Sequence, residues 1–301
     1  MMETNYHNPV LLKESVDGLN IIENGIYVDV TFGGGGHSRE ILRRLGDAGK
    51  LFAFDQDEEA LQNIIRDERF TLINENFRYI KQFLKFYGIR KVNGILADFG
   101  VSSHQFDKAE RGFSTRFDAN LDMRMSSSNK KSAYEVVNSY SYDDLRKVLF
   151  RYGDLRRADP MAKTIVEHRD KTPIRTTSDL KLALKNYLPK FKENKILAQV
   201  YQAIRIEVNE ELSAIEEFLL QTPDIMDKGG RLSLISYHSL EDRLVKRFIR
   251  SGNFSGEVEK DFYGNTITPF KKIGGLIVPT DSEIARNSRA RSARLRIAER
   301  I

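Results

Sequence analysis

The stretch that decides the fold is residues 28–38, VDVTFGGGGHS, in which four consecutive glycines stand between an apolar run and a helical pattern. Glycine lets a backbone turn sharply, and a turn that opens a helix presents bare amide groups to a ligand. Binders of nucleotides and of dinucleotides share such turns, and a tight strand-to-helix connection without a ligand has the same sequence. The stretch therefore predicts a strand–turn–helix unit and leaves its ligand open.

Short apolar runs and helical patterns alternate from residue 25 to residue 100. Four repeats of this kind with short connections predict a parallel, doubly wound sheet. Strand character returns near residue 229, and the chain closes on a further predicted strand. The predicted strands are residues 26–30, 51–55, 70–74, 94–100, 229–237 and 292–300, and the predicted helices of this part are residues 38–46, 58–67, 78–88 and 242–250.

The alternation stops between residues 108 and 198, where polar loops and helices replace strands. The segment 112–131 is long and has little periodicity, a property more often functional than idle. We therefore predict an α/β domain that is interrupted by a helical insert. Its core comprises residues 1–108 and 199–301, and the insert comprises residues 109–198.

Positive charge is concentrated in one part of the chain. The formal net charge is +5, and residues 145–195 alone carry 14 Lys and Arg against 6 Asp and Glu, a local charge of +8. A basic block beside a nearly neutral remainder favours a polyanionic partner, although solvated basic helices produce the same pattern.

The chain contains no cysteine. Disulfides, thiolate metal sites and cysteine nucleophiles are therefore excluded, and with them the methylation of a pyrimidine ring carbon through covalent attack on the base. No apolar run approaches the ~20 residues that span a bilayer, and the N-terminus lacks the layout of a secretory signal. We expect a cytoplasmic protein without a membrane partner.

The second predicted strand ends at Asp55, 22 residues after Gly33, where an acidic residue accepts hydrogen bonds from ribose hydroxyls. The glycine turn lacks the G-x-G-x-x-G spacing of a dinucleotide site, and S-adenosylmethionine has no phosphate that would require an anion nest. Phe77, after the third strand, offers a flat surface for adenine or is ordinary core. Asp98, after the fourth strand, is placed to accept from the ammonium of a cofactor or from an acceptor amine. These residues favour S-adenosylmethionine, with no metal ion.

Together these segments resemble the MraW-type family, bacterial methyltransferases that act on the N4 amine of a decoding-site cytosine in small-subunit ribosomal RNA. The resemblance implies a Rossmann-like S-adenosylmethionine-dependent methyltransferase core with an inserted helical domain. The similar stretches run in order over nearly the whole chain: residues 7–15, 28–38, 54–57, 98–107, 110–114, 121–125, 201–212, 229–248 and 288–300.

Residue by residue, the resemblance implies a set of cofactor contacts, of which His37 and Gln105 have no independent support. Read alone, His37 is a residue at a helix start and Gln105 is a loop amide. One departure concerns the segment after RYGD, where the family continues with an acidic residue and a phenylalanine and this chain reads LRRADP; Pro160 breaks or starts a helix there. The implied contacts are Gly35, Gly36, His37, Asp55, Phe77, Asp98 and Gln105.

An exocyclic amine is a poor nucleophile, so the enzyme must align it and accept a hydrogen bond from its N–H. The candidates are Asp98 and the pair Ser102 and Ser103, although serines at this position also cap turns. Tyr237 and His238 follow the fifth strand, where they either contact the extruded base or cap the next helix. The base itself must be single-stranded or flipped out.

The partner implied is small-subunit ribosomal RNA within an assembled or assembling subunit, and the sequence leaves the oligomeric state open, a homodimer included. A basic tail of five arginines (Arg286, Arg289, Arg291, Arg294 and Arg296) and the basic insert are candidates to hold phosphates. Three rival hypotheses are a nicotinamide-dependent dehydrogenase, a non-catalytic RNA-binding protein and a methyltransferase acting on another amine. Binding of NAD in place of S-adenosylmethionine would identify the first, and an intact cofactor pocket argues against the second. Fold and cofactor motifs do not exclude the third.

Overall fold

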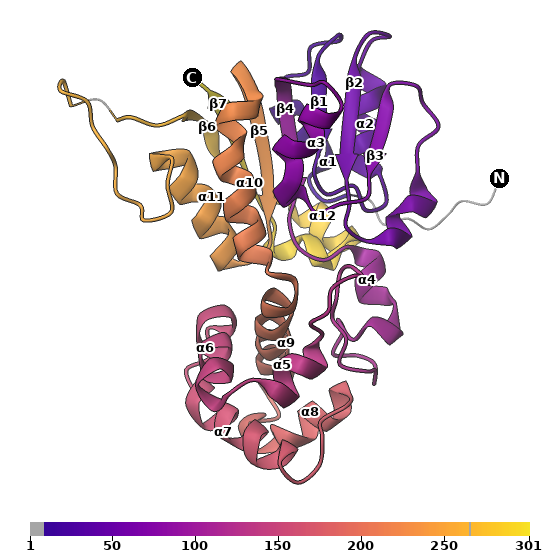
Figure 1. Ribbon diagram of the computed structural model, residues 1–301, viewed down its shortest axis with the longest axis vertical. Helices are drawn as coiled ribbons and strands as arrows, with labels where there is room; N and C mark the ends of the chain where they lie inside the picture. Colours follow the sequence, from indigo (N-terminus) through magenta and orange to yellow (C-terminus); the bar gives the residue numbers. More distant parts are fainter. Residues whose placement is uncertain (1–8, 265) are drawn as a thin grey trace. The chain divides into compact units, whose positions relative to one another are not determined.

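The computed structural model describes residues 9–264 and 266–301. The chain forms two compact units. The core unit comprises the described residues up to Gly100 together with Leu212–Ile301, and the insert unit comprises Val101–Glu211. The segment 109–198, predicted as the insert, falls entirely within the insert unit. Figure 1 shows the strands in the core unit and a cluster of helices in the insert unit.

The core unit contains a seven-stranded sheet in the order β3-β2-β1-β4-β5-β7-β6. Neighbouring strands among the first five pair in parallel, and β7 runs antiparallel to both β5 and β6. Chain order reverses between β1 and β4, the point at which open α/β sheets bind ligands. The strands are β1 Ile26–Asp29, β2 Lys50–Phe54, β3 Phe70–Ile73, β4 Val92–Asp98, β5 Met226–Ser236, β6 Phe270–Ile277 and β7 Arg294–Arg300.

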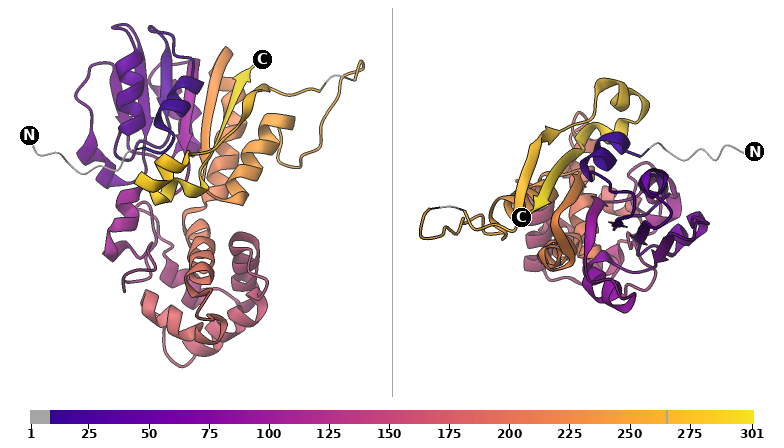
Figure 2. Two further views of the ribbon diagram at one scale, coloured as in Figure 1. Left: turned by 180° about the vertical axis from the view of Figure 1, so that it is seen from behind. Right: turned by 90° about the horizontal axis from the view of Figure 1, so that it is seen from above.

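Helices cover both faces of this sheet (Figures 1 and 2). Residues of α3, α10 and α11 pack with strand residues such as Val28 and Ile95 in one apolar cluster. Residues of α1 and α2 pack with Tyr27, Leu51 and Leu96 in another. Burial on both faces explains why the parallel strands read as continuous apolar runs. The helices are α1 Leu12–Gly18, α2 Gly36–Arg44, α3 Ile80–Phe86, α10 Glu211–Ile225, α11 Ser239–Ser251 and α12 Asp281–Arg286, with 3₁₀ turns η1 Glu58–Asn63, η2 Phe77–Tyr79 and η5 Ser288–Ser292.

The insert unit has its own apolar core, to which the long helix α9 contributes a buried stripe that includes Leu197, Val200 and Ile204. Pro160 lies in the first turn of α7, where a helix leaves its amide N–H groups without intrahelical partners, so proline is tolerated there. The helices are α4 Ser103–Asp107, α5 Ala133–Ser139, α6 Tyr142–Gly153, α7 Ala158–Arg169, α8 Thr177–Ala183 and α9 Glu193–Asn209, with 3₁₀ turns η3 Ala109–Arg111 and η4 Lys185–Tyr187.

The predicted fold class, a Rossmann-like α/β core with a helical insert, is confirmed, although the structure differs locally from the sequence-based expectation. The helix expected at residues 58–67 is only the 3₁₀ turn η1, in which Ala60 is the one buried residue, so little packing favours a longer helix. The edge strand β6 was not predicted, because its exposed lysines and its two glycines, Gly274 and Gly275, show no alternation. Among the described residues no helix combines the length and the apolar character needed to cross a membrane.

Candidate cofactor-binding site

The glycine turn connects β1 to α2 with two residues in the left-handed region, Gly33 at φ 51° and Gly35 at φ 74°. A Cβ on Gly35 would lie 2.8 Å from the ring of Phe32, and a Cβ on Gly36 would lie 2.1 Å from Cγ of Pro9. Gly35 is the N-cap of α2, and no side chain caps this end of the helix. The glycines are therefore required by the backbone, and they leave the amide groups of a helix start uncovered by side chains.

Asp55 follows β2 and ties this strand to the glycine turn. Its Oδ2 accepts from the amide of Gly33 at 2.7 Å, and its Oδ1 accepts from the amide of Asp57 at 2.9 Å. Burial raises the pKa of Asp55 to about 6, although the hydrogen bonds from the two amides lower it. Each carboxylate oxygen has a second acceptor site, so Asp55 is able to hold two further donors such as ribose hydroxyls.

Asp29, at the end of β1, is a buried carboxylate that was not among the predicted site residues. It is fully buried, accepts from the hydroxyl of Ser38 at 2.7 Å and accepts from the amide of Thr31 at 3.1 Å. Burial raises its pKa to about 6. The signal that could have revealed it is an acidic residue inside an otherwise apolar strand, because a buried carboxylate needs a dedicated set of donors.

Asp98 ends β4, next to β1 at the point where the chain order reverses. Its amide donates to Oγ1 of Thr31 at 2.7 Å, and its carboxylate accepts from the hydroxyl of Tyr237. Burial raises the pKa of Asp98 to about 6, while His37 and the Tyr237 hydroxyl lower it. Oδ1 of Asp98 is buried and accepts no hydrogen bond from any described residue. An unpaired buried carboxylate oxygen is costly, so its position suits a cationic donor.

Tyr237 and His238 follow β5, which pairs with β4. The hydroxyl of Tyr237 is committed to Asp98, and its amide donates to Oε2 of Glu241 at 2.8 Å. Burial raises the pKa of the Tyr237 phenol well above its usual value, so it stays protonated as a donor. His238 is the N-cap of α11: its Nδ1 accepts from the amide of Glu241 at 3.3 Å, and its Nε2 lies 3.0 Å from Oε1 of Glu241.

His37 is the second residue of α2, and its imidazole is buried. Nε2 lies 3.2 Å from the carbonyl oxygen of Val10, so this nitrogen carries the proton and donates. Burial lowers the pKa of His37 and outweighs the charge of Asp98, which raises it. The ring is therefore neutral near pH 7. His37 therefore anchors the N-terminal segment and leaves Nδ1 as an acceptor.

Phe77 begins the 3₁₀ turn η2 directly after β3. Its ring is half-buried and packs against Phe99 and Phe218, with centroids 6.0 and 5.5 Å away. It is thus packed against the core and partly exposed, which is compatible with either of its predicted roles, a surface for adenine or ordinary core.

The remaining predicted residues, Ser102, Ser103 and Gln105, belong to the insert unit. Ser102 is the N-cap of α4: its hydroxyl accepts from the amide of Gln105 at 3.2 Å, and Oε1 of Gln105 accepts from the amide of Ser102 at 3.0 Å. Ser103 begins α4, but its side chain lies outside the described residues. Of the five tail arginines, Arg294 and Arg296 form ion pairs with Asp242 at 3.1 and 2.7 Å.

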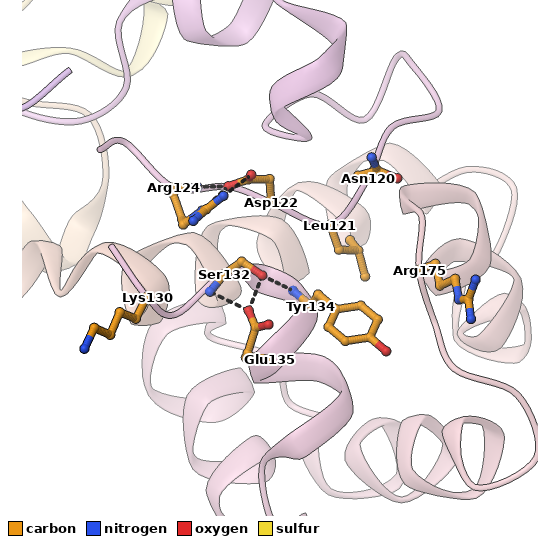
Figure 3. Close-up of a pocket in the computed structure, with 9 residues that line it drawn as sticks. All are labelled: Asn120, Leu121, Asp122, Arg124, Lys130, Ser132, Tyr134, Glu135 and Arg175. Carbon is orange, nitrogen blue, oxygen red and sulfur yellow. Dashed lines mark hydrogen bonds and ion pairs between the residues drawn. The ribbon is translucent and has the colours of Figure 1, made fainter. Parts of the chain in front are cut away.

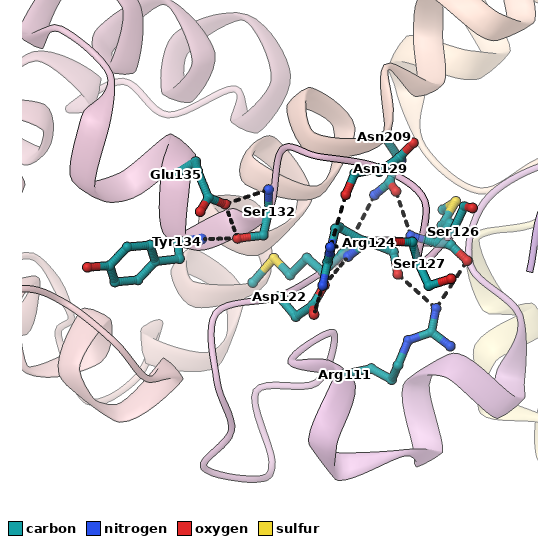
Figure 4. Close-up of polar contacts among 12 residues, drawn as sticks. Arg111, Asp122, Arg124, Ser126, Ser127, Asn129, Ser132, Tyr134, Glu135 and Asn209 are labelled. Carbon is teal, nitrogen blue, oxygen red and sulfur yellow. Dashed lines mark hydrogen bonds and ion pairs between the residues drawn. The ribbon is translucent and has the colours of Figure 1, made fainter.

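The long loop after η3 is ordered by arginines (Figure 4). Arg111 donates to the carbonyls of Arg124 and Met125, and Arg124 pairs with Asp122 at 2.8 Å. Asn209 of α9 donates to the carbonyl of Met123 at 2.7 Å. Beside this network lies an open pocket of about 360 Å³ (Figure 3), lined by Asn120, Leu121, Asp122, Arg124, Lys130, Ser132, Tyr134, Glu135 and Arg175.

The sequence is similar to known proteins over nearly its whole length. The model of the MraW methylase family matches residues 4–301. The Ribosomal RNA small subunit methyltransferase H of Christiangramia forsetii is 66% identical over 301 residues, 100% of both chains. The protein of the same name from Flavobacterium johnsoniae is 68% identical over 296 residues, 98% of each chain. Among solved structures, an rRNA methylase from Streptococcus thermophilus is similar with 13% identity and a TM-score of 0.43, over 96% of this chain and 95% of that one.

Proposed function

The chain belongs to the MraW methylase family, and on this premise we propose that it transfers a methyl group from S-adenosylmethionine to the N4 amine of a cytosine in the decoding region of small-subunit ribosomal RNA. The relatives named ribosomal RNA small subunit methyltransferase H, matched over at least 98% of their length, support this class of substrate. The observation that carries the cofactor assignment is the buried Oδ1 of Asp98, which has no donor among the described residues at the sheet's switch point.

S-adenosylmethionine supplies a methyl group on a sulfonium sulfur and presents an ammonium, a ribose diol and an adenine. The core unit has a matching group for each of these three. Asp98 is the acceptor for the ammonium, Asp55 is the acceptor for the diol, and the accessible side of Phe77 is the surface for adenine. Gly35, Gly36, His37 and, from the insert unit, Gln105 complete the proposed contacts. We propose a reaction without a metal ion.

The acceptor nitrogen needs orientation more than deprotonation. Its lone pair is delocalised into the ring, and an acceptor for its N–H directs that lone pair toward the methyl carbon. Once the new bond forms the proton becomes acidic, so a strong base is not required. The candidate acceptors are Asp98, Ser102 and Ser103. The absence of cysteine supports a nitrogen target, because attack by a thiolate on a ring carbon has no nucleophile in this chain.

Tyr237 and His238 have a narrower proposed role than contact with the base. Tyr237 donates to Asp98, and His238 caps α11. We assign to Tyr237 the orientation of Asp98, with Oδ1 left for the ligand. Glu241 fixes the backbone that carries Tyr237, because its Oε2 accepts from the amides of Tyr237 and His238. His238 holds the start of α11 in turn, since its Nδ1 accepts from the amide of Glu241.

The insert unit is the proposed RNA-binding part. Its basic block, a local charge of +8 over residues 145–195, supports contact with phosphates. A base inside a duplex is out of reach, so the target cytosine is unpaired or flipped out when it reacts. We propose the small subunit, assembled or assembling, as the physiological form of the substrate.

Methyl transfer to purified ribosomal subunits tests this function. The protein is incubated with S-adenosylmethionine labelled in its methyl group and with small or large subunits from cells that lack the enzyme. We expect label in the RNA of the small subunit only, and much less with the Asp98→Asn variant. Label in ribosomal protein or in large-subunit RNA would refute the proposed substrate.

A further inference from the structure

Phe191 is the most exposed large apolar side chain among the described residues, with 101% of its reference surface accessible. It lies in the turn between η4 and α9. The turn is held by a hydrogen bond from the amide of Lys192 to the carbonyl of Pro189 at 2.8 Å. Its N-terminal side is anchored, because Tyr187 and Leu188 pack against the core of the insert unit. The structure thus places an apolar ring in water on an ordered backbone, where it gains nothing for folding.

Lysines surround this ring. Lys190 and Lys192 flank Phe191 in sequence, and Lys185 and Lys195 lie within one helical turn of the segment. All four are exposed, and none of them forms an ion pair with a described residue. The acidic residue at the start of α9, Glu193, is paired with Lys181 at 2.5 Å. The turn therefore presents an aromatic ring inside a patch of free positive charge.

A second exposed phenylalanine, Phe262, provides a contrast within the same chain. It is 96% exposed in the loop between α11 and β6, beside Tyr263, with ring centroids 5.6 Å apart. Its neighbours Glu257, Glu259 and Asp261 make this loop acidic. The two phenylalanines are similarly exposed, but the charge around them differs. We expect a polyanion to be repelled by the loop of Phe262 and attracted to the turn of Phe191.

We propose that Phe191 stacks on an unpaired base of the RNA substrate while Lys190 and Lys192 contact the adjoining phosphates. The inference rests on the proposed function and adds a contact that reads single-stranded RNA. Base–aromatic stacking tolerates any base, and alternating aromatic and basic groups are the means by which proteins follow a single strand. The lysines that form no ion pair with a described residue favour an RNA over a protein as the partner, because RNA supplies a phosphate at every nucleotide.

The chain contains no tryptophan, so Phe191→Trp introduces a single fluorescent reporter at the proposed contact. The probe is an oligocytidylate of about 12 nucleotides, within the usual site size of such surfaces, and inorganic polyphosphate is the control without bases. Phe262→Trp is the matched control protein. Binding is followed separately through the anisotropy of a dye on the oligonucleotide.

We expect saturable quenching of the tryptophan fluorescence of the Phe191→Trp variant with oligocytidylate, little change with polyphosphate, and no quenching in Phe262→Trp. Phe191→Ala should weaken binding by about 5- to 100-fold without changing the salt dependence. Lys190→Gln with Lys192→Gln should lower the salt slope by about 0.7 for each phosphate that the protein no longer neutralises.

Unchanged fluorescence of Phe191→Trp at saturating, independently measured RNA binding would overturn the inference. Equal quenching by polyphosphate would also overturn it, since the ring would then report charge and not stacking. Methyl transfer to small subunits by the unaltered protein measures the proposed function separately. If transfer is observed while the stacking test fails, only the stacking contact is refuted. A protein that neither methylates the subunits nor binds the oligonucleotide would refute both proposals.

Discussion

The hydroxyl of Tyr237 donates a hydrogen bond to the carboxylate of Asp98, and thereby joins the ends of the neighbouring strands β5 and β4. Oδ1 of this carboxylate is buried and has no hydrogen-bond donor among the described residues. Burial keeps the Tyr237 phenol protonated, so it remains a hydrogen-bond donor over the pH range in which Asp98, with a pKa of about 6, ionises. The pair is therefore the proposed site for the ammonium of the cofactor.

Removal of this hydroxyl in Tyr237→Phe should weaken cofactor binding in a pH-dependent way. The bond favours the ionised form of Asp98, so its loss raises the pKa of that carboxyl further. We expect affinity for S-adenosylhomocysteine, which carries the same ammonium, to fall by about tenfold at pH 6 and by less at pH 8. Calorimetric titration at the two pH values measures the effect. Tyr263→Phe, on an exposed loop, is the control, and an equal loss at both pH values would argue against the orienting role.

Cofactor binding should also release protons near pH 6. The pKa of Asp98 is about 6 in the free protein because burial raises it, so roughly half of the molecules carry the proton at that pH. An ammonium binds the ionised form, and affinity must therefore fall as pH falls through 6, by about tenfold per pH unit once one proton is displaced. Calorimetry in buffers of different ionisation enthalpy counts the proton. Binding without proton release at pH 6 would remove an ionised Asp98 from the contact.

Asp98→Asn separates two roles for this residue. If Asp98 chiefly holds the ammonium, cofactor affinity should fall by at least about tenfold, and the single-turnover rate at saturating cofactor should fall less. If it chiefly accepts the N–H of the target amine, affinity should change little and the rate should fall by about 10²-fold or more. We predict the first pattern. Rapid-quench single-turnover measurements beside calorimetry distinguish them, and near-normal affinity with a collapsed rate would contradict the assignment.

Asp55→Ala should reduce cofactor affinity by at least about tenfold while the protein remains folded, since the substitution removes charge-assisted hydrogen bonds to the ribose. It also removes the acceptor that holds the amide of Gly33, so the glycine turn loses its tie to β2. Asn74→Ala is the matched control, because Asn74 donates to the carbonyl of Asp55 at 2.8 Å and does not touch its carboxylate. Unchanged calorimetric affinity in Asp55→Ala would exclude this carboxylate from the site.

The parts of the site that depend on residue type and strand order along the chain were predictable. A run of glycines between a strand and a helix implies left-handed backbone, and Gly33 and Gly35 adopt it. Acidic residues at the ends of predicted parallel strands share one edge of the sheet, which places Asp55 and Asp98 on the same side. Both inferences use only local chemistry and the periodicity of the pattern.

Contacts that depend on the tertiary structure were not predictable in this way. The bond between Tyr237 and Asp98 requires that β5, more than a hundred residues later in the chain, pair with β4, and periodicity carries no information about that pairing. The buried pairing of Asp29 with Ser38 depends equally on how α2 folds back on β1. Exposure of Phe191 is a result of helix packing in the insert unit, whereas from sequence alone a phenylalanine among lysines fits one face of an amphipathic helix.

The chemical identity and the position of the transferred methyl group decide whether this protein is a cytosine N4 methyltransferase. Small subunits from cells that lack the enzyme are methylated by the purified protein, their RNA is digested to nucleosides and to fragments, and both are analysed by chromatography with mass spectrometry. The proposal predicts N4-methylcytidine at one position in the decoding region, resolved from ring-methylated cytidine by retention time. A methyl group on a ring carbon, on another base or outside the decoding region would contradict it.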